Sequence, residues 1–460
     1  MKLRLTALCL TAATAMLCLT GCGDVSDLSK VSGSSASESA SAETGRESGA
    51  DSGAEPADDG TEREADVHFD LEMKGEAAEY MTAADEASPA AAMPDTHEGD
   101  VQNITESSAA EDDSQPFVLT AGEWNDLENW GFFMNLVKNK TVQFPVYGLE
   151  PMNRISVTLT HDGVPATNRT VRLEGIDSRL WWQAKTDSSG RAYLFYPTDT
   201  KQANTYILQA EGAASVEIEI PAAGEAAEGQ GISTPSLEYE FECNTDGEKY
   251  DRTEVMFILD TTGSMGDEIS YLQKDFAAIA GEVADENMTF SVNFYRDEGD
   301  EYVTKCNPFT ADVQEVQRLL NAEYADGGGD MPEAVTQILE ETMKRGDWHE
   351  DTNKIAFLIF DAPPHGAAYD TEEDYSALIS SIAAASSQGV HLIPVVASNA
   401  ARETELFGRS CAIMTNSSYV FLTDDSGVGE SHLEPIIGDY DVELLHDIIV
   451  RNIRAVAQAQ

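Results

Sequence analysis

The sequence predicts an α/β protein with a doubly wound, mostly parallel sheet, preceded by a small β-sandwich and a disordered acidic tether. Short apolar runs alternate with helical patterns in the second half of the chain, which is typical of a parallel sheet covered on both faces. Between residues 155 and 220, apolar residues recur at every second position, as in half-buried strands. Residues 23–116 carry 25 acidic against 4 basic residues and should not fold.

The N-terminus has the features of an export signal. Lys2 and Arg4 precede an apolar stretch, residues 5–19, that is short for a membrane span, and Cys22 follows Leu19-Thr20-Gly21. This run resembles the lipobox of bacterial lipoproteins, which implies that residues 1–21 are removed and that a lipid on Cys22 anchors the chain. The alternative is an ordinary secretory signal. We expect a lipid-anchored protein on the extracytoplasmic face of the cell membrane, with residues 22–116 as its tether.

Composition limits the partners of the 460-residue chain. The formal charge of -55 disfavours nucleic acid and anionic lipid head groups, which would repel such a surface. After export, Cys243, Cys306 and Cys411 remain, an odd number at wide spacing. We expect free, mostly buried thiols and no disulfide framework.

Residues 117–235 are predicted to form the β-rich domain. Trp130, Phe133, Met134 and Val137 share one face of a candidate helix, and we interpret them as core. Alternating strands follow at 155–159 and 216–220, with turn signals at 161–165 and 186–190. The set resembles the small immunoglobulin-like sandwiches of bacterial surface proteins.

Residues 237–460 show the regular alternation of an α/β domain. The predicted strands are 255–259, 289–295, 301–306, 355–360, 390–397 and 419–422, and the predicted helices are 312–320, 332–343, 375–387 and 442–457.

Three oxygen-bearing side chains follow the first of these strands. Asp260, Thr262 and Ser264 lie in a loop at the carboxyl end of strand 255–259, where open α/β sheets bind ligands. Carboxylate and hydroxyl oxygens suit Mg²⁺ or Mn²⁺.

The pattern D-x-T-x-S at 260–264 resembles the metal-ion-dependent adhesion site of von Willebrand factor type A domains. The runs D-G-G-G-D-M-P-E at 326–333 and F-L-I-F-D-A-P-P-H-G at 357–366 look like the family's second and third metal loops. The resemblance implies that Thr262 and Ser264 bind a divalent cation directly, while Asp260 and Asp361 hold bound water. Mg²⁺ is the expected ion, with Mn²⁺ or Ca²⁺ as alternatives.

The second loop departs from the family pattern, because Asp330 stands where adhesion receptors offer a threonine. Asp330 either ligates the metal as well or only caps the helix that follows, with Pro332 and Glu333 completing a capping-box-like start. The acidic residues of the 297–301 turn could hold a second cation, although a solvated turn is the simpler reading. His365 is interpreted as a loop-packing residue.

The leading hypothesis is a lipid-anchored adhesion protein that binds a protein or glycan partner through the metal and is not an enzyme. A metal-dependent envelope hydrolase is the alternative, with His365 or a 297–301 acid as its base. A structural spacer with an empty site is the third possibility.

We expect Cys22→Ser to release the protein from membranes, because the substitution removes the thiol that would carry the lipid. Fractionation of cells into membrane and soluble parts measures this. A variant that stays with the membranes would contradict the lipoprotein interpretation.

Overall fold

The computed structural model describes residues 118–197, 204–220, 237–329, 331–365, 372–426 and 431–458. The predicted signal (1–21), Cys22, the predicted tether (22–116) and Asp330 lie outside the described residues. No helix of the described part is long and apolar enough to cross a membrane.

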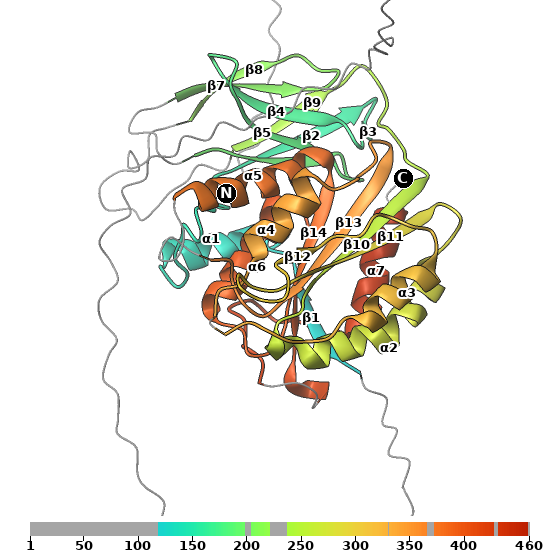
Figure 1. Ribbon diagram of the computed structural model, residues 1–460. Helices are drawn as coiled ribbons and strands as arrows, with labels where there is room; N and C mark the ends of the chain where they lie inside the picture. The colour runs from blue at the N-terminus through green and yellow to red at the C-terminus, as the bar shows by residue number, and fades with distance from the viewer. Residues whose placement is uncertain are drawn as a thin grey trace, which may run out of the picture. The chain divides into compact units, whose positions relative to one another are not determined.

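A large, mostly parallel sheet forms the centre of the α/β region (Figure 1). Its parallel strands pair in the spatial order β11, β10, β13, β14 and β15, and a short antiparallel strand, β12, borders β11. The bounds are β10 Arg252–Asp260, β11 Met288–Tyr295, β12 Thr304–Lys305, β13 Thr352–Phe360, β14 Val390–Val396 and β15 Tyr419–Leu422. This arrangement confirms the predicted fold class.

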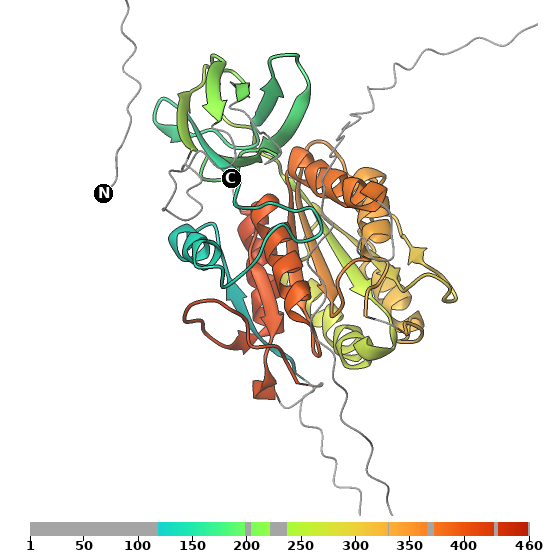
Figure 2. The ribbon, with the colours of Figure 1, turned by 90° about the vertical axis from the view of Figure 1, so that its left-hand side faces the viewer.

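Helices cover both faces of this sheet (Figure 2). One face carries α2 (Gly266–Val283), α3 (Val313–Ala322) and α7 (Leu445–Ala457); the other carries α4 (Val335–Leu339), α5 (Glu372–Gln388) and α6 (Arg402–Met414). In β10, Val255, Phe257 and Leu259 face the first set of helices, whereas Met256 and Ile258 face the second. A strand buried on both sides explains the unbroken apolar run in its sequence.

The first strand, β1 (Thr120–Trp124), belongs to the large sheet. It pairs antiparallel with β15 and with the short strand β16 (Glu443–Leu444). The prediction that residues 117–235 form one β-rich domain is therefore wrong for this segment. The close pairing depends on Gly122, where an added Cβ would lie 2.4 Å from the Phe421 ring.

The β region itself consists of two four-stranded sheets. One contains β2 (Arg154–His161), β3 (Val164–Pro165), β6 (Arg191–Phe195) and β9 (Leu237–Glu242); the other contains β4 (Thr170–Gly175), β5 (Leu180–Lys185), β7 (Asn204–Ala210) and β8 (Val216–Ile220). Because β9 pairs with β2, residues 237–242 belong to the β region and not, as predicted, to the α/β domain. The predicted helix is α1 (Trp130–Lys138), and Phe133, Met134 and Val137 are buried as expected.

Two helices differ from the prediction. Helix α6 was not predicted, because all its residues from Thr404 to Met414 are buried, including Glu405 and Arg409, and no polar face marks it. The helix expected at 332–343 begins at Val335 with Ala334 as N-cap and continues as a π-helix over Glu340–Lys344. Asp330, the first residue of the expected capping box, lies outside the described residues, and Glu333 precedes the helix instead of lying in its first turn.

The β region packs directly against α5. The indole nitrogen of Trp182 on β5 donates a buried hydrogen bond of 3.1 Å to the Ser386 hydroxyl on α5. Buried side chains of the β region and of the α4, α5 and α6 face form one continuous hydrophobic cluster.

The three described cysteines are free; Cys243 and Cys411 are buried as expected, whereas Cys306 is exposed.

A buried ion pair joins the segment after β1 to α6. The Arg409 guanidinium donates to both carboxylate oxygens of Asp126, at 2.8 and 2.7 Å, and both side chains are at most 3% exposed. We expect Asp126→Ala to destabilise the fold by about 3 kcal/mol, because the buried Arg409 loses its bidentate carboxylate partner and keeps only one carboxylate, Glu405, at 3.0 Å. Denaturant unfolding measures this loss. Glu315→Ala, which breaks the exposed pair with Arg318, should change stability little, and equal losses would contradict the interpretation.

His446 links α7 to α2 through two carboxylates. Its ring nitrogens lie 2.8 Å from Asp275 and 3.1 Å from Glu282. Burial alone would lower the pKa of His446, but these two acids outweigh it and raise the pKa above 6.5.

A raised folded-state pKa adds stability that is complete below the unfolded pKa and is lost as pH rises through the folded value. We therefore expect wild type to melt above His446→Gln near pH 5.5, with a gap that closes by about pH 9. Melting curves across this range check the sign. A difference in melting temperature between wild type and His446→Gln that widens as pH rises would contradict the predicted sign.

Candidate metal centre

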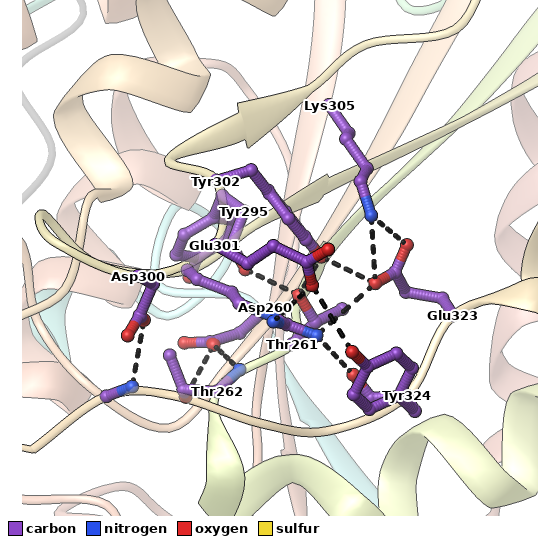
Figure 3. A network of polar contacts seen from close by, with 12 residues as sticks. Asp260, Thr261, Thr262, Tyr295, Asp300, Glu301, Tyr302, Lys305, Glu323 and Tyr324 are labelled. Carbon is purple, nitrogen blue, oxygen red and sulfur yellow. Dashed lines mark hydrogen bonds and ion pairs between the residues drawn. The ribbon is translucent and has the colours of Figure 1, made fainter.

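Asp260 is the last residue of β10 and is completely buried. Its Oδ1 accepts hydrogen bonds from the Thr262 backbone N–H (2.9 Å) and the Thr262 hydroxyl (2.7 Å; Figure 3). Its Oδ2 has no hydrogen-bond partner among the described residues. One carboxylate oxygen thus orients the Thr262 hydroxyl, and the other stays available.

The electrostatic surroundings of Asp260 disfavour its charge. Burial, followed by the nearby charge of Asp361, raises the pKa of Asp260 to about 7. The hydrogen bonds from Thr262 lower it in part, as does Tyr295. Tyr295 is close enough to lower the pKa of Asp260. Its buried hydroxyl nevertheless makes no hydrogen bond of acceptable geometry with any described residue. A cation beside Asp260 would compensate the buried charge.

A glycine loop lies against the Asp260 loop. The Gly263 N–H donates to the Gly327 carbonyl at 3.2 Å, and the Asp326 N–H donates to the Thr261 carbonyl at 3.1 Å. Gly327 has a φ of +83°, and an added Cβ there would lie 2.4 Å from the Asp300 carboxylate. Glycine is therefore required at this position.

Glu333 is a carboxylate that the sequence did not predict at the metal centre. It is 4% exposed, and its Oε2 has no hydrogen-bond partner among the described residues. Burial and then the charges of Asp260, Asp297, Asp361 and Asp300 raise the pKa of Glu333 to about 9. From the sequence, Glu333 is expected in a helix cap. Its position shortly after a glycine run, at the same edge of the sheet as Asp260, could have indicated a role at the metal centre.

These loops enclose an open pocket of about 220 Å³. Thr262 and Ser264 line it from the β10 loop, Glu333 from the segment before α4, and Asp361 from the end of β13. Asp260 lies beneath Thr262 and does not line the pocket itself. The remaining lining residues are Gly263, Gly327, Gly328, Gly329, Met331, Ala362 and Asn399. The structure thus brings four of the five predicted residues to one edge.

The hairpin acids surround the pocket without lining it. Asp300 accepts from the Gly328 N–H at 2.9 Å and so holds the glycine loop. Asp297 contacts His365, with 2.5 Å between Oδ1 and Nε2. Both His365 and Asp297 are almost buried, in agreement with a packing role for the histidine.

The donor set fits a hard divalent cation. Two hydroxyls face the pocket together with Asp361 and Glu333, and two buried carboxylate oxygens lack partners nearby. Within the described residues, no group of three or more His, Cys, Asp and Glu is arranged to hold a metal by itself. A site built from the described residues would include the Thr262 and Ser264 hydroxyls.

Comparison with known proteins identifies the domain that contains this pocket. The sequence profile described as "von Willebrand factor A domain" matches residues 254–428. A mimivirus protein (Acanthamoeba polyphaga mimivirus) named "Putative ariadne-like RING finger protein R811" is 28% identical over 117 residues, which are 24% of this chain. The match spans 11% of that protein's length.

A solved structure, the conserved hypothetical protein BatB from Bacteroides thetaiotaomicron, is similar at 13% identity. The similarity covers 45% of this chain and 87% of that chain, with a TM-score of 0.24. The profile match starts within β10 and ends beyond β15, so it spans all the parallel strands of the large sheet and the loops that line the pocket. Residues 254–428 of this chain form a von Willebrand factor A domain.

Proposed function

We propose that this chain is a lipid-anchored, extracytoplasmic binding protein whose von Willebrand factor A domain engages a protein or glycan partner through a divalent cation. The observation that carries the proposal is the pair of buried, unpartnered oxygens, Asp260 Oδ2 and Glu333 Oε2, beside the pocket. Burying a carboxylate without a counter-charge is costly, and a cation removes that cost.

Each residue has a distinct part in this proposal. Thr262 and Ser264 offer hydroxyl oxygens, and Asp260 fixes the Thr262 hydroxyl through Oδ1. Glu333 and Asp361 supply anionic oxygen from two other loops. When bound, the cation offers an open coordination position to an oxygen of the partner.

The contact between His365 and Asp297 favours binding over hydrolysis. A hydrolase would need a general base within reach of a metal-activated water. His365 is not among the residues that line the pocket, and its Nε2 is held by Asp297. The binding function therefore needs fewer rearrangements than the hydrolase that the sequence left open.

We expect Mg²⁺ to raise the melting temperature of the full chain in detergent. An ion present at a hundred times its Kd stabilises the native state by about 2.7 kcal/mol. Asp260→Asn should abolish the increment and Glu333→Gln should reduce it, because both remove anionic oxygen from the site. Differential scanning calorimetry with Mg²⁺ or with chelator measures each variant.

The matched control is Glu217→Gln, an exposed acid on β8. It should keep the full Mg²⁺ increment. An equal increment in wild type and Asp260→Asn would refute the metal site, as would a wild-type melt that saturating Mg²⁺ leaves unmoved.

A further inference from the structure

The carboxylates at the pocket exceed the charge of one divalent cation. Glu333 and Asp361 line the pocket, and Asp260 holds the Thr262 hydroxyl at its wall. Asp300 accepts from the Gly328 N–H of the pocket and from the Asp297 N–H beside it, which makes five acids in one cluster. Their formal charge of about -5 falls only to about -3 when one divalent ion is bound.

The basic side chains at and beside this edge are already paired with the protein's own acids: Arg296 with Glu301 and Glu323, Lys305 with Glu323, and Arg402 with Glu405. In the described loops 261–268, 296–303, 323–329, 331–333, 361–365 and 397–401, Arg296 is the single Lys or Arg. It is 1% exposed, donates to the Tyr324 carbonyl at 2.8 Å and pairs with Glu323. Its guanidinium therefore faces the protein and cannot meet a partner's carboxylate.

The rim of the pocket, defined here by its exposed residues in these loops, is acidic and in part apolar. Its acids are Asp267, Glu298, Glu301 and Asp326. Its apolar members are Met331, which lines the pocket and is 46% exposed, and Tyr324, which is 54% exposed. A lysine or arginine side chain of a partner, which has an aliphatic stem and a positive end, matches both the apolar and the acidic part of the rim.

We infer that this edge takes a partner that presents a neutral oxygen, a hydroxyl or a carbonyl, to the cation and places a lysine or arginine side chain on the rim. A partner carboxylate is disfavoured, because it would enter a cluster that stays negative after the cation binds. The inference rests on the proposed function and names the chemistry of its partner.

Three matched peptides test this inference: acetyl-glycyl-seryl-lysine amide and its glutamine and glutamate counterparts. They are titrated into the full chain loaded with Mn²⁺, in detergent. Paramagnetic broadening of the peptide NMR lines reports peptide near bound Mn²⁺. The broadening that is lost in Asp260→Asn is the part that comes from the pocket, because Mn²⁺ held elsewhere on the acidic chain is the same in both proteins. Electron paramagnetic resonance of free Mn²⁺ measures ion binding separately.

The lysine peptide should bind most tightly and the glutamate peptide about tenfold more weakly, with glutamine between them. The double variant Glu298→Gln, Asp326→Asn should narrow this gap several-fold while leaving Mn²⁺ affinity unchanged. The matched control, Glu217→Gln with Glu219→Gln on β8, should keep the gap.

The outcomes separate the two proposals. Absence of Mn²⁺ binding refutes the proposed function itself. Normal Mn²⁺ binding with the glutamate peptide equal or strongest, or with none of the peptides broadened, overturns only the inference about the partner. An affinity difference between the lysine and glutamate peptides that the double variant leaves unchanged also overturns the inference about the partner, because the rim acids would then not discriminate between the peptides.

Discussion

Buried carboxylate charge at the carboxyl end of the sheet is the constraint on which this structure depends. Asp260 lies at the end of a central strand that is covered on both faces, so its carboxylate cannot reach water. One oxygen is satisfied by Thr262, and the other has no described partner. Such a group raises the free energy of the folded state unless something positive compensates it. The donors around it are consistent with a cation in that role.

The loops that surround Asp260 are held by the protein itself. Backbone hydrogen bonds connect the Asp260 loop to the glycine loop, and Asp300 holds that loop from the hairpin. Positive φ at Gly327 and Gly328 lets the backbone pass close to Asp300 and Thr262. These contacts hold the loops around Asp260 through the protein's own backbone and side chains.

Sequence patterns predicted the parallel strands and the shared edge of Asp260, Thr262, Ser264 and Asp361, because strand period and loop position follow from local residues. They missed what depends on distant contacts. Strand β1 joins the sheet by pairing with β15, about 300 residues later, and no local pattern records such pairing. Helix α6 lacks a polar face because its Arg409 and Glu405 are buried as an ion pair and Arg409 also pairs with the buried Asp126. The sequence pattern around Glu333 is typical of a helix start, but the helix begins two residues later, at Val335.

The net charge of the chain and the local charge of the pocket act over different distances. At physiological ionic strength the Debye length is about 8 Å, so most of the formal charge of -55 is screened at the cation. The acids that a bound partner meets are those of the rim and the cluster around Glu333. Buried members of this cluster are screened less than exposed ones, because little salt or water separates them from the ion. The partner preference that we infer would therefore be a local property of the loops around the pocket, separable from the overall acidity of the chain.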